Sequence, residues 1–210
     1  MNMNSKISEM QGHKTLVIGL QGSGKTYWAK QKLKTIEKNK KILIYSPHKW
    51  DWRNMPDNFI FLKYENFGDP KEVEKVMGIA RDLAKKGELY FLVIDEFDML
   101  FSSNLNLGRN SVDVFANHRH FGEQINHKGL GIFGITRRPQ DIPTRYVESC
   151  RYLVVFSIEG ENVKKKLNAI FKGFGDKVAR LNYTEYKYYV KEIGKSPTLF
   201  SPLGAPENEN

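Results

Sequence analysis

The stretch of sequence that decides the fold is Gly19-Leu20-Gln21-Gly22-Ser23-Gly24-Lys25-Thr26. The apolar residues 15–20 lead into it, and a segment with helical periodicity follows it. This strand–loop–helix context is typical of a phosphate-binding P-loop and argues against an ordinary glycine-rich turn. The glycines let the backbone turn its N–H groups inward around phosphates, and the start of the next helix adds partial positive charge. The sequence therefore predicts a nucleotide site of the P-loop type.

The residue types in this loop predict individual roles. Lys25 is expected to reach the β- and γ-phosphates of ATP, and the hydroxyl of Thr26 is expected to ligate Mg²⁺. ATP and Mg²⁺ are thus the predicted cofactors. The remaining nucleotide contacts are predicted to come from Gln21, Gly22, Ser23, Gly24 and Tyr27.

A second motif follows the apolar residues 90–94, where Asp95 and Glu96 stand side by side. A carboxylate at the end of a strand beside a P-loop can hold Mg²⁺ through water, and this role is predicted for Asp95. Glu96 is expected at the carboxyl end of the sheet, where ligands bind, and is predicted to polarise the water that attacks the γ-phosphate. Because a kinase must exclude an activated water, Glu96 indicates hydrolysis.

A third candidate strand, residues 131–136, ends in Thr136 and Arg137. If this strand lies between the two strands that carry the motifs, Thr136 or Arg137 would face the γ-phosphate. A side chain in that position can sense whether the phosphate is present. Both residues are therefore predicted to take part in catalysis.

Short apolar runs alternate with helical patterns along the chain, which predicts an α/β fold with a mainly parallel sheet flanked by helices. Helices are expected around residues 29–36, 73–84 and 163–174, with a less regular one over 111–126. The strands are expected at residues 15–20, 41–46, 59–63, 89–95, 131–136 and 152–157.

The pattern becomes β-rich after residue 177 and predicts a small C-terminal extension. Tyr183, Tyr186, Tyr188 and Tyr189 alternate with lysine and glutamate, which favours a two-sided edge strand over a platform for stacking bases. We expect four parts, namely a flexible N-terminus (1–13), an ATPase core (14–182), a strand or hairpin extension (183–201) and a flexible tail (202–210).

Composition narrows the class of protein further. The 210 residues are 40% hydrophobic, include one cysteine and contain no apolar run near the roughly 20 residues of a membrane-spanning helix. A disulfide framework and a cysteine-rich zinc site are therefore excluded, and an intracellular location is expected. The formal net charge of +9 favours a polyanionic partner, with nucleic acid ahead of membrane.

Taken together, these motifs resemble the FtsK–HerA superfamily. The resemblance rests on the P-loop, on Asp95-Glu96, and on the sequences of residues 118–122, 135–139 and 141–143. Within the superfamily the chain looks most like the genome-packaging ATPases of tailless icosahedral viruses, including archaeal turreted viruses with an internal membrane. The resemblance implies a RecA-like, additional-strand core and a homo-oligomeric ring, a pentamer or hexamer, that translocates double-stranded DNA into a preformed capsid. It also implies a location in the host cytoplasm or on the virion, with a capsid vertex or internal membrane proteins as further partners.

Two points of this resemblance concern single residues. The family usually carries glutamine at the position of Arg137, so the sensor here is expected to be Thr136, Arg137 or Gln140. Ring ATPases also complete a neighbour's site with an arginine that stabilises the transferring phosphoryl group. Arg109 and Arg119 are the predicted residues for that role in trans.

Three alternatives remain open at this point. A P-loop nucleoside or nucleotide kinase has a similar length, but it needs an arginine-bearing lid that the sequence does not show. A Zot-like assembly ATPase of filamentous phage shares much of this core and normally adds a transmembrane helix. A nucleotide-gated DNA-binding or scaffold protein would not turn over ATP, and Glu96 argues against it.

Overall fold

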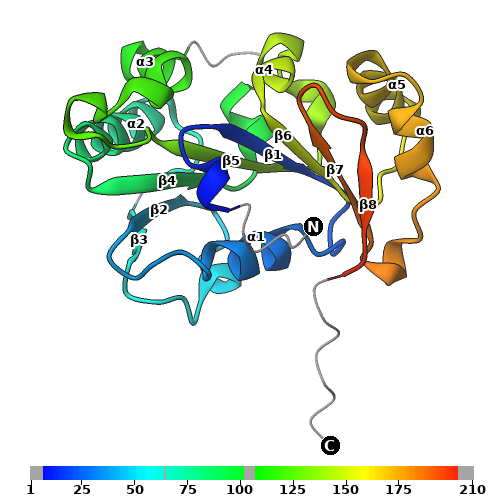
Figure 1. Ribbon diagram of the computed structural model, residues 1–210, viewed down its shortest axis with the longest axis horizontal. Helices are drawn as coiled ribbons and strands as arrows, with labels where there is room; N and C mark the ends of the chain where they lie inside the picture. Colours follow the sequence, from blue (N-terminus) through cyan, green and yellow to red (C-terminus); the bar gives the residue numbers. More distant parts are fainter. Residues whose placement is uncertain (1–6, 64, 102–106, 203–210) are drawn as a thin grey trace, which may run out of the picture.

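The computed structural model describes residues 7–63, 65–101 and 107–202 (Figure 1). At its centre is an eight-stranded sheet with the strand order β3-β2-β4-β5-β1-β6-β7-β8. The flexible segments predicted at the two ends fall partly outside the described residues, which exclude 1–6 and 203–210. The strands are β1 (Lys14–Ile18), β2 (Lys41–Tyr45), β3 (Phe59–Phe61), β4 (Leu89–Ile94), β5 (Gly131–Thr136), β6 (Tyr152–Val155), β7 (Tyr188–Glu192) and β8 (Thr198–Phe200).

The order of the central strands determines where the motifs meet. Strands β1 to β6 run parallel, and β5 pairs with β1 on one side and with β4 on the other. The strand that leads into the P-loop is therefore separated from the Asp95-Glu96 strand by β5, the additional strand. Helices cover both faces of this sheet, and the predicted α/β fold class is confirmed.

Alternation along each strand divides the core into two layers. In β1, Leu16 and Ile18 join the cluster that packs against α2 to α6, while Val17 joins the cluster that packs against α1. In Figure 1, α1 accordingly lies below the sheet and the other helices lie above it. The helices are α1 (Lys25–Leu33), α2 (Pro70–Lys85), α3 (Arg109–Asn117), α4 (Thr144–Ser149), α5 (Glu161–Ile170) and α6 (Phe174–Ala179).

Two helices are shorter than their apolar patterns indicate. The helix expected over 111–126 ends at Asn117, because the chain then turns to enter β5: the Leu130 N–H donates to the His118 carbonyl oxygen at 2.8 Å. Gly122, in the left-handed region at φ +76°, continues this turn. The pattern over 163–174 is divided between α5 and α6, and Gly173 at φ +74° lies at the break.

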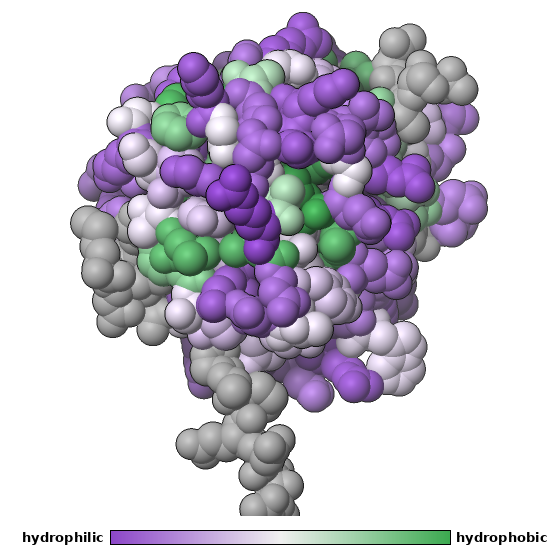
Figure 2. Space-filling view, turned by 90° about the vertical axis from the view of Figure 1, so that its right-hand side faces the viewer, coloured by the Kyte–Doolittle hydropathy of each residue, from purple (hydrophilic) through white to green (hydrophobic). Residues whose placement is uncertain are grey.

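The C-terminal extension continues the main sheet. Strand β7 pairs antiparallel with β6, and β8 pairs antiparallel with β7. The edge-strand interpretation is wrong: Tyr183 and Tyr186 precede β7, and β7, which contains Tyr188 and Tyr189, lies between β6 and β8. Figure 2 shows that the face carrying β8 and α6 is mostly hydrophilic, with a small apolar area near its centre. Within the described part of the chain, no helix is both long and apolar enough to cross a membrane.

Candidate nucleotide-hydrolysis site

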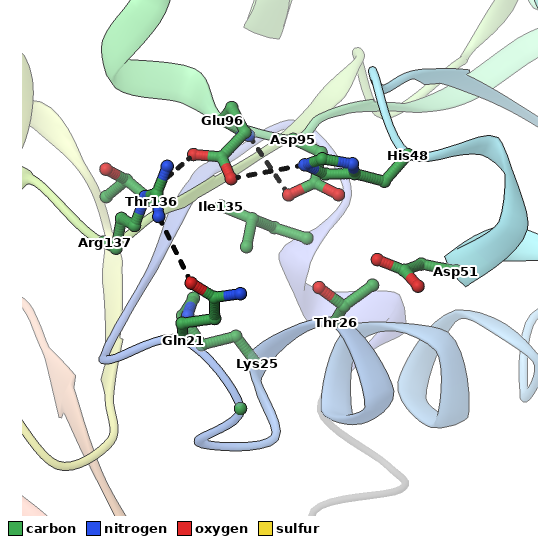
Figure 3. Close-up of a pocket in the computed structure, with 11 residues that line it drawn as sticks. Gln21, Lys25, Thr26, His48, Asp51, Asp95, Glu96, Ile135, Thr136 and Arg137 are labelled. Atoms are coloured by element: carbon green, nitrogen blue, oxygen red, sulfur yellow. Dashed lines mark hydrogen bonds and ion pairs between the residues drawn. The ribbon is translucent and has the colours of Figure 1, made fainter.

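The three sequence motifs meet in one pocket of about 330 Å³ at the carboxyl ends of β1, β4 and β5. Parallel strands bring their carboxyl ends to one edge of a sheet, and ligands bind in the crevice there. In Figure 3 the side chains from the P-loop, β4 and β5 surround the same space. The lining residues are Gln21, Gly22, Lys25, Thr26, His48, Asp51, Asp95, Glu96, Ile135, Thr136 and Arg137.

The P-loop has the conformation that its glycines predict. Gly22 and Gly24 have φ values of +75° and +93°, a region that residues with a Cβ rarely adopt. Helix α1 begins directly afterwards at Lys25, so its free N–H groups point toward the pocket. Ser23 and Gly24 belong to the loop without lining the pocket, and Tyr27 is half exposed on α1.

Lys25 lies inside the loop, and its burial disfavours the charged form of the side chain. Its ammonium group donates to the Leu20 carbonyl oxygen at 2.6 Å. Burial lowers the pKa of Lys25 to about 8, although the nearby carboxylates of Asp95 and Glu96 partly oppose this effect. Without nucleotide, a considerable fraction of Lys25 is therefore neutral near pH 8.

This lowered pKa predicts a pH dependence of nucleotide binding. Below pH 8, Lys25 is protonated before and after binding, so the affinity for nucleotide has its full value. Above pH 8 the free protein loses the proton, while bound phosphates raise the pKa of Lys25, so binding must take up a proton. We expect the affinity for a non-hydrolysable ATP analogue to fall about tenfold per pH unit from pH 8 upward, until the pH reaches the raised value. Lys25→Arg stays charged over this range, and the same slope in that variant would contradict the assignment to Lys25.

Asp95 is held by three hydrogen-bond donors at the end of β4. The Ser46 hydroxyl and the Trp52 indole N–H donate to Oδ2 at 3.0 and 3.3 Å, and the Glu96 N–H donates to Oδ1 at 3.1 Å. The buried carboxylate thus keeps a fixed orientation toward the pocket. With the Thr26 hydroxyl on the opposite wall, the oxygen donors fit Mg²⁺, which prefers a few protein oxygens together with phosphate and water.

Trp52 was not predicted as a site residue, because nothing in the sequence around it indicates a contact with Asp95. The side chain is buried at 1% exposure, whereas Trp50 is 77% exposed. Trp52→Phe keeps the ring and removes the N–H that orients Asp95. We expect this variant to need about 10–100-fold more Mg²⁺ for MgATP binding, with nucleotide affinity in the absence of Mg²⁺ unchanged. Trp50→Phe is the matched control, and equal Mg²⁺ titrations for the two variants would show that Trp52 does not position Asp95.

Glu96 occupies a strained position between the side chains of His48 and Arg137. Its φ of +48° is uncommon for a residue other than glycine, and such strain is concentrated at functional sites. One carboxylate oxygen lies 3.6 Å from His48 Nε2, and the other lies 3.6 Å from Arg137 Nε. Figure 3 shows Glu96 across the pocket from Lys25, which leaves room between them for the terminal phosphate and a water.

The three candidate sensors are placed very differently. The Thr136 hydroxyl is buried, donates to Asp98 at 2.5 Å and accepts from the Arg138 N–H at 2.9 Å. Gln140 lies in the 3-10 turn Pro139–Asp141 and is exposed outside the pocket. Arg137 reaches both motifs, because it donates to Gln21 at 3.4 Å and pairs with Glu96. The geometry therefore favours Arg137 as the residue that contacts a γ-phosphate.

Arg109 and Arg119 are not among the described residues that line the pocket. Arg109 begins α3 and is exposed. The adjacent Asn110 N–H donates to Glu74 in the second turn of α2, near the carboxyl edge of the sheet. Arg119 lies at the opposite, amino edge, where it lines a separate cavity with Lys14 at the start of β1. Neither arginine therefore contributes to the lining of the pocket in its own chain, and their role in trans stays a prediction.

The chain is similar to known proteins in sequence and in fold. The sequence model of the family described as "Zonular occludens toxin (Zot)" matches residues 14–126. No curated protein matches the chain significantly.

Solved structures share the fold at low sequence identity. The DNA-packaging ATPase B204 from Sulfolobus turreted icosahedral virus is 18% identical with a TM-score of 0.75, over 92% of this chain and 99% of that one. The genome packaging NTPase B204 from Sulfolobus turreted icosahedral virus 2, in complex with ATP-gammaS, is 16% identical with a TM-score of 0.73, over 91% and 98%. The pCW3 conjugation coupling protein TcpA is 13% identical with a TM-score of 0.63, over 96% and 61%.

The structural likeness confirms the predicted resemblance to packaging ATPases at the level of the fold. The family match supports the Zot-like alternative, which the sequence alone did not favour. It starts at the strand before the P-loop and extends beyond Asp95-Glu96, over more than half of the 210 residues. On that basis, this chain belongs to the Zonular occludens toxin (Zot) family.

Proposed function

We propose that this chain is an ATPase that uses ATP hydrolysis to translocate double-stranded DNA, packaging a viral genome into a preformed capsid. The observation that supports hydrolysis is the meeting of Lys25, Thr26, Asp95, Glu96 and Arg137 in one pocket. Each residue type matches one task of phosphoryl transfer to water. The packaging role is supported by the fold shared with viral packaging ATPases.

In this proposal each side chain has one task. Lys25 and the N–H groups at the start of α1 bind the β- and γ-phosphates. Thr26 would ligate Mg²⁺ and Asp95 would hold it through water, and the ion would neutralise charge on the phosphate oxygens. Glu96 accepts a proton from the attacking water, with His48 and Arg137 orienting its carboxylate. Arg137 then contacts the γ-phosphate and reports its loss to Gln21 of the P-loop.

Double-stranded DNA is the proposed polymer substrate. The net charge of +9 provides a general attraction for a polyanion. Helices α5 and α6, the connection between them and the residue after α6 contribute a set of exposed basic side chains, Lys165, Lys172, Lys177 and Arg180. We further propose a homo-oligomeric ring, a pentamer or hexamer, that acts in the host cytoplasm or on the virion and contacts a capsid vertex or internal membrane proteins.

The family match favours a second candidate, a Zot-like assembly ATPase of the filamentous-phage type. Both candidates use the same hydrolysis site. They differ in whether duplex DNA stimulates turnover.

Phosphate release with and without double-stranded DNA tests the proposal. We expect release that DNA stimulates, that Lys25→Ala abolishes and that rising salt suppresses steeply, because phosphate contacts dominate such binding. Two unrelated duplexes of equal length should compete equally. Release without any effect of DNA would favour the assembly ATPase. Transfer of phosphate to a nucleoside would identify a kinase, and nucleotide-dependent DNA binding without release would identify a scaffold.

A further inference from the structure

Two tyrosines border the P-loop on the side away from Glu96. A methyl group at the Cα of Gly22 would lie 2.5 Å from the Tyr183 hydroxyl oxygen. A methyl group at the Cα of Gly24 would lie 3.4 Å from Cδ1 of Tyr186. The two glycines that give the loop its shape therefore also give these two side chains room beside it.

The segment that carries the tyrosines is fixed in place. The Asn182 side chain accepts hydrogen bonds from the Thr184 N–H at 3.1 Å and from the Thr184 hydroxyl at 2.9 Å, which closes the turn. The Ser157 hydroxyl donates to the Leu181 carbonyl oxygen at 3.2 Å, and the Ser157 carbonyl accepts from the Leu20 N–H at 3.0 Å. The tyrosine segment is thus tied to the first residues of the P-loop.

The core does not require these two rings. Tyr188, three residues from the turn, is 2% exposed and packs against Trp28, Phe156 and Phe200. Tyr183 and Tyr186 are 42% and 49% exposed. Tyr186 also has a φ of +51°, so the backbone is held in an uncommon conformation at an exposed aromatic residue. Exposed rings in a fixed, strained segment beside a ligand loop indicate contact with the ligand.

The direction in which a nucleotide would extend along the P-loop also leads to the tyrosine segment. The groups that act on the γ-phosphate, Glu96 and Arg137, come from β4 and β5 on one side of β1. The nucleoside is attached to the other end of the triphosphate. It must therefore leave the loop on the other side of β1, where β6 and the start of β7 carry the tyrosine segment.

We propose that Tyr183 and Tyr186 form the subsite for the nucleobase, with the base of the nucleoside triphosphate stacked on their rings. Flat heteroaromatic bases stack on tyrosine rings with little regard to their hydrogen-bonding edges, because every base has a π face. The subsite thus contributes affinity for a nucleoside triphosphate over inorganic polyphosphate, with only a weak preference among bases. This inference rests on the proposed nucleotide-binding function of the P-loop.

The test compares two ligands that share phosphates and differ in the base. Binding of ATP and of inorganic tripolyphosphate is measured for the wild-type chain and for Tyr183→Ala, Tyr186→Ala and the double variant. We expect the double variant to lose about tenfold or more in affinity for ATP, with tripolyphosphate affinity changed less than twofold. Tyr183→Phe and Tyr186→Phe keep the rings and should bind ATP as the wild type does. Leu199→Ala, at an exposed residue of β8, is the control for a change on the same edge of the fold.

Three other results would contradict the base subsite, and one of them would also contradict the nucleotide site. If the affinities for ATP and tripolyphosphate fall together, the tyrosines only support the P-loop and the base subsite is wrong. If neither affinity changes, the base binds elsewhere and the subsite is also wrong. If the wild-type chain binds neither ligand, the proposed nucleotide site fails, and the subsite fails with it.

The base subsite can also be tested on the wild-type chain, without any variant, by photolabelling. Photolabelling with 8-azido-ATP places a reactive group on the base itself. We expect the label on the peptide that contains residues 183–186, and excess ATP should prevent it. Labelling of residues 48–55, at the far side of the pocket, would overturn the subsite.

Discussion

Replacing Glu96 by glutamine is expected to stop ATP turnover while ATP binding stays close to normal. The amide has nearly the same shape as the carboxylate but cannot accept a proton from water, and general-base catalysis contributes about 10²–10⁴-fold. Single-turnover phosphate release and equilibrium binding of a non-hydrolysable ATP analogue should be measured on the same preparation.

Lys25→Ala is the matched comparison for this prediction. It removes a direct phosphate contact, so it should weaken binding as well as turnover. His48→Ala is a second comparison, because it removes one of the two side chains that orient the Glu96 carboxylate and leaves the carboxylate in place, so turnover should fall less than in Glu96→Gln. Near-normal phosphate release by Glu96→Gln would show that another group activates the water.

Mixing two inactive variants is expected to restore activity if an arginine acts across a subunit boundary. Arg109 and Arg119 lie outside the pocket at different edges of the sheet, so either one could act only from a neighbouring copy of the chain. An arginine finger supplies about 10³–10⁵-fold in rate, so loss of the right one should almost abolish turnover. Specific activity of the wild type should also rise with protein concentration, or on DNA that gathers subunits.

Arg137 supplies the control for that experiment, because it contacts Glu96 within its own chain. Arg109→Ala or Arg119→Ala subunits have an intact P-loop, and Lys25→Ala subunits can offer them the missing arginine. Arg137→Ala subunits lack part of their own pocket, so the same mixture should stay inactive. Activity per subunit that is constant on dilution, with no mixture restoring turnover, would show a site complete within one chain.

The sequence predicted those parts of the molecule that depend on neighbouring residues. The P-loop and Asp95-Glu96 are local patterns, and the strands were predicted within a few residues. Helix α2, expected over 73–84, begins earlier, at Pro70, because Asp69 caps its first N–H groups and proline fits the first helical position.

The remaining features depend on contacts between distant segments. Ser46 and Trp52 reach Asp95 from 49 and 43 residues away, and no pattern marks them as a pair. The helix predicted over 111–126 was wrong beyond Asn117 because the approach to β5 competes with apolar periodicity. Tyr183 and Tyr186 fitted an alternating strand, and only the turn capped by Asn182 places them beside the P-loop.

The position of β1 between β5 and β6 also determines when the protein acquires its activity during synthesis. Thr15 lies opposite Phe133 on one side and Tyr152 on the other, so both neighbours of β1 come from the second half of the chain. Closing such long loops is entropically costly and makes folding slow. A nascent chain that has passed residue 96 contains Lys25, Thr26, Asp95 and Glu96, yet the strand before its P-loop has no partner strand. We therefore expect ATP to bind only those chains whose synthesis has passed β6. ATP would then stabilise the fold late in synthesis and not at an early stage.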